Sequence, residues 1–299
     1  MNLVNIKNFK AFKIKLPAAT KLQELLEPVL FKEIGDNDFK RAGFINHPVT
    51  EELVPTFEGG FSLTLRFDSR ILPKPIILKE AAKRIAKLEN EQYRKLKRSE
   101  KNTIISEMAI ELCPKAFVKT AIISAYYHTD SETLFITTTS DELAQSLLHG
   151  LVHAIGSVVS KTLHVSDVKH GLTTRLINYL HNHDTPFSGF TFGNVVQLSR
   201  VGDNKETVKY DGREVEVIDN LLNDLQNGFT VDNMTLSYNG INFRLTDRFY
   251  FNQISFDEKN EKLSDEISVY EQWQHESSIK ILLIVDMLNK LTTELSIND

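Results

Sequence analysis

ILPKPIILKEAAKRIAKLENEQYRKLKRSEK, residues 71–101, concentrates positive charge in a chain that is otherwise acidic. The whole chain of 299 residues has a formal net charge of -5. Between Lys79 and Lys101, nine lysines and arginines stand against four glutamates, an excess of five positive charges. Residues 257–299 have the opposite bias, with ten acidic and four basic residues. This asymmetry predicts a separate basic surface, which is what a protein that binds a polyanion needs.

The pattern of the stretch predicts a long helix over residues 76–98, because Pro73 and Pro75 are typical of a helix start. Ser99 can cap a second helix over residues 100–112, which Pro114 ends. At 3.6 residues per turn, one set of cations falls within roughly 50° of a single line. The set is Lys79, Lys83, Lys87, Arg94, Lys97, Arg98 and Lys101. Leu78, Ala81, Ile85, Leu88 and Leu96 fall on the opposite side. If Ser99 breaks the helix, Lys101 leaves the basic face and the others remain on it.

The basic face has two interpretations at this point. A solvated helix face usually mixes charges at i,i+4, because that spacing stabilises opposite charges. Here Lys79, Lys83 and Lys87 repeat one charge at that spacing, and so do Arg94–Arg98 and Lys97–Lys101. Glu80–Arg84 and Glu91–Lys95 are opposite pairs, but they lie on the flanks. Composition therefore leaves both a polyanion-binding face and a solvated face open.

The remaining sequence predicts strand pairs mixed with helices. The expected strands are 4–16, 61–67 (half-buried), 118–128, 132–139, 194–210, 229–237 and 241–251. The expected helices outside the basic stretch are 18–30, 141–155 (capped by Ser140 or Asp141), 171–182, 215–226 and 264–296. Residues 35–58 and 181–194 read as loops, and Asn239-Gly240 as a hairpin turn. The fold class predicted from this order is α+β with mainly antiparallel sheets.

Composition also limits the cellular compartments in which the protein is expected. Cys113 is the single cysteine, so no disulfide can form within the chain, which fits a reducing compartment. Lysines interrupt the first sixteen residues, which lack the apolar core of a signal peptide. No stretch approaches the roughly 18 apolar residues of a membrane span. The expectation is a soluble, cytoplasmic protein without a membrane partner.

Candidate catalytic and metal sites are weak. His149 and His153 have a chelating i,i+4 spacing, but no third ligand is evident. His181 and His183 near Asp184 form a weaker candidate. Acid-x-Lys tripeptides occur at Asp38, Asp167, Asp203 and Asp257, close to the roughly three that chance gives. We therefore expect no catalytic residue, metal or cofactor, and Cys113 reads as a small buried side chain. A metal-dependent nuclease and a protein-interaction adaptor with a basic docking helix remain the alternatives.

The basic stretch and its continuation resemble the bacterial recombination-associated protein family RdgC. The resemblance is carried by four segments: Ile71, Leu72, Pro73 and Pro75; Ala86 to Glu89; Arg94 to Lys97; and Pro114 to Phe117. Weaker similarity lies in IKNFKAFKI near the start, at Gly43-Phe44 and in the hairpin of 229–251. The family's usual Trp-Phe-Lys-Asn start is replaced here by Asn5-Ile6-Lys7-Asn8, and residues 150–228 match poorly. These departures are typical of a divergent member.

The resemblance implies a non-enzymatic protein that binds double-stranded DNA without sequence preference, associates with the nucleoid and restrains the recombinase RecA. It implies a horseshoe-shaped subunit that forms a homodimeric ring around DNA. The implied regions are a central region, 1–75 continued by 117–180, a basic helical tip, 76–116, and a base, 181–299, with a long C-terminal helix. The implied DNA-binding residues are the seven cations of the basic face together with Lys115 and Phe117. Phe117 could equally be a core residue or an exposed aromatic beside Lys115 and Lys119.

Overall fold

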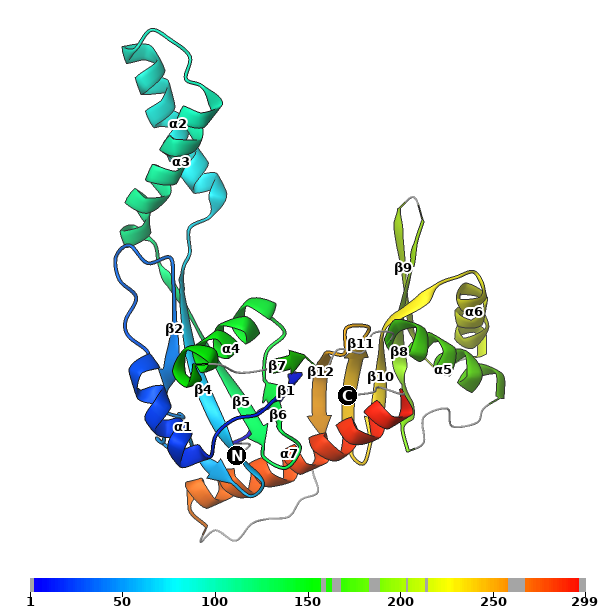
Figure 1. The fold of residues 1–299 in the computed structure, drawn as a ribbon. Helices are drawn as coiled ribbons and strands as arrows, with labels where there is room; N and C mark the ends of the chain where they lie inside the picture. The colour runs from blue at the N-terminus through cyan, green and yellow to red at the C-terminus, as the bar shows by residue number, and fades with distance from the viewer. Residues whose placement is uncertain are drawn as a thin grey trace.

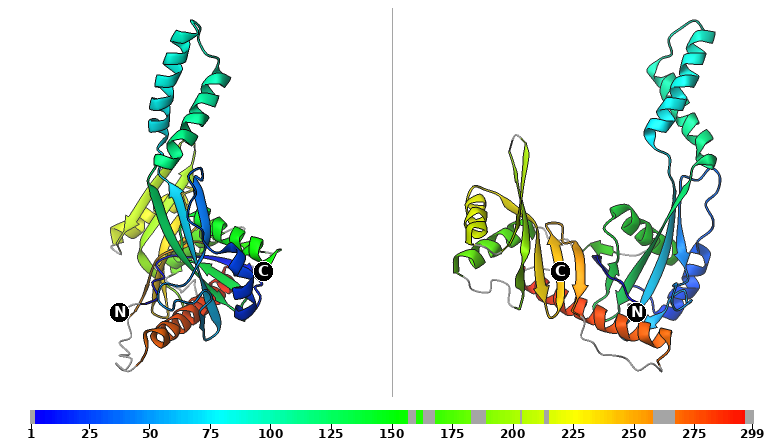
Figure 2. Two further views of the ribbon diagram at one scale, coloured as in Figure 1. Left: turned by 90° about the vertical axis from the view of Figure 1, so that its left-hand side faces the viewer. Right: turned by 180° about the vertical axis from the view of Figure 1, so that it is seen from behind.

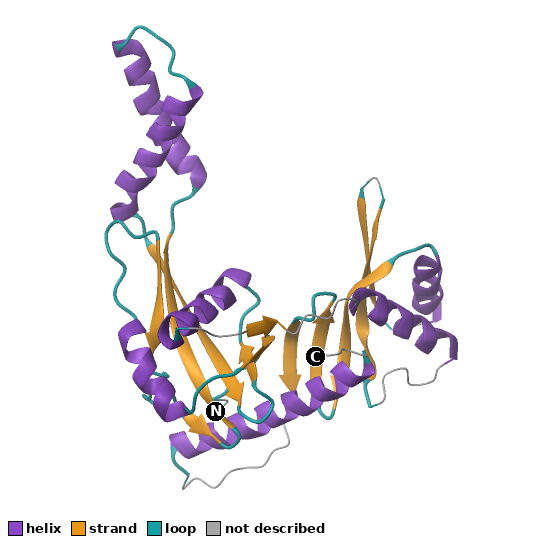
Figure 3. Ribbon diagram, viewed as in Figure 1, coloured by secondary structure: helices purple, strands orange, loops and turns teal. Residues whose placement is uncertain are grey.

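Two antiparallel sheets and a set of helices form the protein (Figure 3). A computed structural model describes residues 3–156, 160–162, 168–182, 189–202, 204–212, 215–257 and 267–295. Within these ranges the strands form a seven-stranded and a five-stranded sheet, and every pairing between named strands is antiparallel. The predicted α+β class with antiparallel sheets is confirmed.

The first sheet has the order β2-β4-β5-β6-β1-β7, with β3 paired to β4. Its strands are β1 (Lys10–Ile14), β2 (Lys40–Ile45), β3 (Thr56–Phe57), β4 (Gly60–Arg70), β5 (Val118–His128), β6 (Thr133–Ile136) and β7 (Ser160–Thr162). The expected pair β5–β6 is confirmed. The expectation of a loop over 35–58 is wrong at β2 and at the two-residue strand β3. At β2, Gly43 lets the strand lie against the backbone of Phe31. A Cβ at Gly43 would lie 2.4 Å from Phe31 Cα.

Strand β4 is buried on both faces along its first half, so the expectation of a half-buried strand is wrong there. Phe61, Leu63 and Leu65 pack beneath α1 (Ala19–Leu26) and α4 (Asp141–Ile155). Ser62 and Thr64 on the other face are buried as well. Ser62 pairs with Tyr126, which belongs to the core that the C-terminal helix covers. Helix α4 is capped as predicted, since Ser140 Oγ accepts a hydrogen bond from the Leu143 N–H.

The second sheet has the order β12-β11-β10-β8-β9. Its strands are β8 (Thr191–Val201), β9 (Lys205–Asp211), β10 (Thr230–Tyr238), β11 (Ile241–Thr246) and β12 (Phe251–Phe256). Helices α5 (Val168–Asn182) and α6 (Val215–Gln226) lie at its far end (Figure 1). Asn239-Gly240 forms the expected turn, with positive φ at both residues. The single strand expected over 241–251 is two strands, because the chain turns at Phe249, whose φ is 59°.

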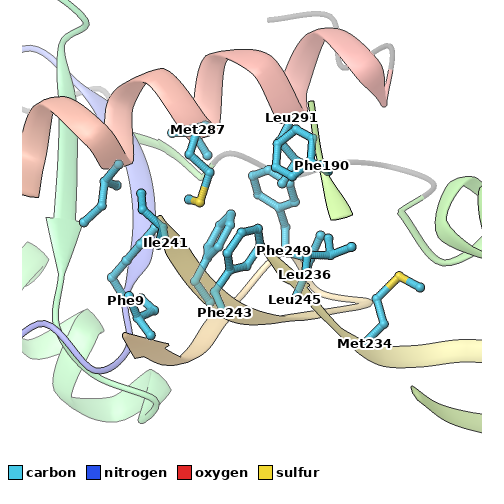
Figure 4. Packing of buried hydrophobic residues seen from close by; sticks show 14 of the residues in the cluster. Phe9, Phe190, Met234, Leu236, Ile241, Phe243, Leu245, Phe249, Met287 and Leu291 are labelled. Atoms are coloured by element: carbon cyan, nitrogen blue, oxygen red, sulfur yellow. The ribbon is translucent and has the colours of Figure 1, made fainter. Parts of the chain in front are cut away.

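Helix α7 (Val269–Glu294) runs beneath both sheets and ties them together (Figure 1). Its capping box is formed by Ser268 and Glu271. Met287 and Leu291 of α7 point onto Phe243 of β11 and onto Phe190, which directly precedes β8 (Figure 4). The two sheets also join directly. The Phe9 N–H donates to the Phe251 carbonyl at 2.9 Å, and the two rings stack at 4.5 Å. The largest core therefore lies at this junction.

Two projections rise from the same side of the two joined sheets, so that the subunit has the outline of a horseshoe (Figures 1 and 2). One is a pair of helices, α2 (Lys74–Glu91) and α3 (Arg98–Leu112), inserted between β4 and β5. The other is the β8–β9 hairpin. The short 3-10 helices η1 (Glu27–Val29) and η2 (Cys113–Lys115) follow α1 and α3.

None of the helices in the described ranges has the length and hydropathy that crossing a bilayer requires.

Candidate nucleic-acid interface

The basic stretch forms a helical hairpin, here called the helical arm: α2, the loop 92–97 and α3. Pro75 lies in the first turn of α2, where its missing N–H removes no helical hydrogen bond. Helix α2 ends at Glu91, and Tyr93 follows with φ of 52°. Helix α3 begins at Arg98, where the Glu100 carboxylate accepts the Lys97 N–H at 2.7 Å.

The predicted continuous helix over 76–98 is therefore wrong by two turns at its C-terminal end. Packing explains the break. The two helices face each other and bury Ala81, Leu96 and Ile104, whereas a single straight helix would leave this apolar side in water. Leu96 contributes from the loop instead of from the helix. Leu78, expected on the buried side, is exposed.

The break also divides the predicted basic face. Lys79, Lys83 and Lys87 share one side of α2, as expected from their i,i+4 spacing. Arg94 and Lys97 lie in the loop. Arg98 and Lys101 belong to the first turn of α3, which runs back along α2. The seven cations are thus spread over the arm and do not form a single helical stripe.

Several cations of the arm are already paired with glutamates. Lys83 pairs with Glu80 at 2.7 Å, Lys87 with Glu91 at 3.9 Å, Arg94 with Glu100 at 2.6 Å, and Lys101 with Glu89 at 2.9 Å. Arg84 pairs with Glu107 and Glu111 of α3, and Lys95 with Glu89, so the expected pairs Glu80–Arg84 and Glu91–Lys95 are not the ones formed. These pairs lower the charge that the arm offers to a ligand.

A second group of cations, on the arm and at its base, has no carboxylate within 4.0 Å of the charged side-chain nitrogens in the part of the chain that the structure describes. The members are Lys74, Lys79, Lys97, Arg98, Lys115 and Lys119, and all are exposed. Lys74 was not singled out by the sequence, and Lys119 was noted only as a neighbour of Phe117, because neither lies on the predicted helical face. We call these six residues the unpaired cations. They extend from the base of the arm to its far end, and they carry the positive charge that remains available for phosphate binding.

The base of the arm is anchored to the first sheet. Arg70 donates from Nη1 to the Ala116 carbonyl at 3.1 Å, and the Ile71 N–H donates to the Phe117 carbonyl at 2.8 Å. Phe117 itself is 84% exposed, so the interpretation of this residue as a core side chain is wrong. Its ring stands in solvent, and its neighbours in the sequence include Lys115 and Lys119. An exposed aromatic beside cations is an arrangement that nucleic-acid-binding surfaces use.

The other projection differs in its charge. On the β8–β9 hairpin, Arg200 pairs with Glu206 at 2.6 Å and Lys209 with Asp211 at 3.5 Å. Lys205 pairs with Asp232 of β10 at 3.4 Å. Each of these cations therefore has a carboxylate partner, whereas the helical arm keeps several cations without one among the described residues.

The alternative sites gain no support in the described residues. His149 and His153 are both exposed on α4, and in the described ranges no group of three or more His, Cys, Asp or Glu side chains is arranged to hold a metal ion. Asp38 is engaged with Arg41, which lowers the pKa of that carboxyl, and Asp257 accepts from Asn242. His183, Asp184, Asp167 and Asp203 lie outside the described residues. Cys113 is buried, as expected, with its Sγ 3.5 Å from the Asp38 carbonyl.

Comparison with known proteins identifies relatives of this chain. The family model described as "Putative exonuclease, RdgC" matches residues 4–297. The recombination-associated protein RdgC of Yersinia enterocolitica serotype O:8 is 26% identical over 189 residues, 62% of this chain and 60% of the relative. The protein of the same name from Yersinia pestis (strain Pestoides F) is 28% identical over 144 residues, 47% of each chain.

The chain thus spans about three fifths of the length of the first relative and about half of the second. The match to the family model covers nearly all of the chain, including both sheets, the helical arm and α7. The chain belongs to the RdgC family of recombination-associated proteins.

Proposed function

We propose that this protein binds double-stranded DNA without sequence preference through its helical arm and thereby restrains RecA-type recombination in the nucleoid. The observation that carries the proposal is the projection of the arm from the sheets with a set of cations that have no carboxylate partner among the described residues. Lysine and arginine bind phosphates by releasing condensed counterions, which supplies affinity but reads no base.

The relatives' names support the link to recombination, since both matched proteins are named recombination-associated. The physical character of the arm supports the sequence-independent mode. Its cations are spread over two helices and a loop, so they can follow a phosphate backbone, whereas direct readout places the base contacts on one recognition helix.

The horseshoe outline supports a homodimeric ring. One subunit leaves the side between the two projections open (Figure 2). Two copies whose open sides face each other would close a ring around a duplex, and the phosphate contacts within such a ring read no base. In this arrangement the unpaired cations of two arms would act on one DNA molecule.

The test compares two triple variants with the same change in charge. The first replaces Lys79, Lys97 and Arg98 of the arm by Gln. The control replaces Lys15, Lys21 and Lys290 by Gln; these residues pair with Glu132, Glu24 and Glu294 outside the arm. Binding to two unrelated duplexes is measured across a salt series.

The arm variant should bind both duplexes more weakly, and the slope of log K against log salt should fall by about 0.9 for each phosphate that is no longer neutralised. The control should retain the wild-type slope. Equal losses of affinity in both variants would mean that only total charge matters, and an unchanged arm variant would mean that the basic face is merely solvated. Light scattering on the same samples should give a dimer, and a monomer with and without DNA would remove the ring.

Exonuclease activity is the second candidate, because the family description names an exonuclease. The assay incubates an end-labelled duplex with the purified protein and Mg²⁺ or Mn²⁺. An intact strand supports binding without hydrolysis. Stepwise shortening that one acidic substitution abolishes would establish the nuclease.

A further inference from the structure

Tyr93, at the far end of the helical arm, has a conformation and an exposure that folding alone does not explain. Its side chain is 96% exposed. Its φ is 52°, a left-handed conformation that a helix C-terminus normally gives to glycine. An aromatic residue at this position adds strain, and a ring so fully exposed gains little from packing that would offset it.

The loop that presents Tyr93 is nevertheless held firmly on one side. Leu96 is buried between the two helices. The Glu89 carboxylate accepts hydrogen bonds from the Leu96 N–H at 3.0 Å and from Lys95 Nζ at 2.9 Å, and it also pairs with Lys101. These contacts fix the chain just after Tyr93 to α2 and to α3.

The other side of the loop is fixed by Glu100. Its carboxylate accepts two hydrogen bonds from the Arg94 guanidinium, at 2.6 and 3.0 Å, and one from the Lys97 N–H. Tyr93 therefore stands on a braced loop, and its ring extends into solvent. A ligand that contacts this ring does not have to order the loop, which lowers the entropic cost of binding.

The surroundings of Tyr93 indicate the chemistry of the ligand. Lys97 and Arg98, two of the unpaired cations, lie at the same end of the arm. An aromatic face beside such cations fits a nucleic acid, whose bases stack on the ring while its phosphates meet the charges. Contact with the arm of a second copy is less favourable, because it would bring these like charges together.

We propose that Tyr93 stacks on an unpaired base, so that the end of the arm recognises gaps and single-stranded segments within DNA. Bases in an intact duplex already stack on each other and do not offer a face to the ring. The inference rests on the proposed DNA binding, and it adds a preference for unpaired nucleotides that phosphate contacts cannot provide.

The test uses an intact duplex and the same duplex with a short gap in one strand, with 2-aminopurine opposite the gap. The variants are Tyr93→Gly and Tyr93→Phe. Glycine removes the ring and suits the positive φ, so the loop keeps its conformation. Phenylalanine keeps the ring. Val201→Ala, at another exposed apolar position on β8, is the matched control.

Tyr93→Gly should bind the gapped duplex about tenfold more weakly and the intact duplex within about twofold of wild type. It should also abolish the quenching of 2-aminopurine, and its melting temperature should equal or exceed that of wild type. Tyr93→Phe and Val201→Ala should retain both the affinity and the quenching.

Equal affinities of wild type and Tyr93→Gly for the gapped duplex would overturn the inference and leave the proposed function intact. Equal losses of affinity on both duplexes, accompanied by dissociation into monomers in sedimentation, would assign Tyr93 to contact between subunits and also overturn it. If wild type binds neither duplex at low salt, the proposed function itself fails and the inference falls with it.

Discussion

The helical arm and the junction of the two sheets beneath α7 belong to one chain but are stabilised differently. The buried residues of the arm are Ala81, Leu96 and Ile104, with a few partly buried neighbours. The junction buries large aromatic side chains, including Phe9, Phe251 and Trp273. Burial of apolar area is the dominant favourable term in folding, so most of the stability resides at the junction.

The arm compensates for its small core with charge. Glu89 and Glu100 each accept hydrogen bonds from two residues of the loop, and Arg84 links α2 to Glu107 and Glu111 of α3. The same short segment therefore uses some of its cations to hold its shape and leaves others available for a ligand. A count of lysines therefore overestimates the positive charge that a binding surface offers, unless the lysines paired with carboxylates are left out.

The largest expected effect comes from truncating a core side chain, and it should differ between the two regions. Trp273→Ala should lower the free energy of unfolding of the whole protein by about 3–5 kcal/mol, because the ring is fully buried against His47 and Phe57. Ile104→Ala in the arm should act locally. Hydrogen exchange should rise in α2 and α3, while denaturation of the sheets, followed by circular dichroism, should be unchanged.

Trp273 is the single tryptophan, so its fluorescence in the Ile104→Ala variant reports the junction alone. A common shift of the fluorescence transition and of exchange in the arm would show that the two regions unfold as one unit. The comparison between them would then lose its basis.

A smaller effect concerns how the stability of the junction depends on pH. Burial lowers the pKa of His47 from 6.5 to about 4, and its Nδ1 accepts from the Val49 and Thr50 N–H groups. Between these pKa values the unfolded state binds the extra proton, so stability should fall as pH decreases from 6.5 to about 4. The pKa difference corresponds to about 3 kcal/mol over the full window.

His47→Asn removes the titrating group and keeps a side-chain acceptor for the two backbone N–H groups. Chemical denaturation at a series of pH values should give a shallower dependence for this variant than for wild type between pH 6.5 and 4. Parallel curves would show that His47 does not govern the acid sensitivity of the junction.

The smallest effect concerns the arm at lower pH. Hydrogen bonds from the Lys95 and Lys101 side chains and from the Leu96 N–H hold the pKa of Glu89 at about 2, and the Arg94 guanidinium and the Lys97 backbone N–H do the same for Glu100. The stabilisation is present above the ordinary value of 4.5 and is lost as pH falls from 4.5 towards 2. The protection factors of the amides in loop 92–97, which correct for the slower intrinsic exchange at low pH, should decrease over that window.

Glu89→Gln should show the faster exchange already at neutral pH, because a neutral amide cannot pair with Lys95 and Lys101. Glu24→Gln on α1, whose partner Lys21 lies on the same helix, is the control and should leave the loop unchanged. Equal protection of the loop at neutral pH and at pH of about 2 would mean that the carboxylates do not brace it.

Much of the fold could be predicted from the sequence where local patterns are strong. The hairpin β5–β6, helix α4 with its Ser140 cap, the Asn239-Gly240 turn and the long C-terminal helix are confirmed. Strand β2 and the division of residues 241–256 into two strands were missed. Both depend on close contacts, at Gly43 against Phe31 and in the turn at Phe249, that no local periodicity records.

The candidate site was predicted only in part. The sequence placed the charge in the arm and placed Lys79, Lys83 and Lys87 on one side of α2. Tyr93 carried no sequence signal, because its exposure follows from the end of α2 at Glu91. Phe117 was left between two interpretations, and only the structure placed its ring in solvent.

The sequence by itself determined the α+β class, the basic character of residues 71–101 and the resemblance to RdgC, because periodicity, charge and motif spacing are local properties of the chain. Tertiary structure decided where the basic helix breaks, which cations are paired and how α7 joins the two sheets. These features depend on contacts between residues distant in sequence, such as Arg84 with Glu111 and Phe9 with Phe251. Packing and charge pairing across such distances become fixed only when the chain folds.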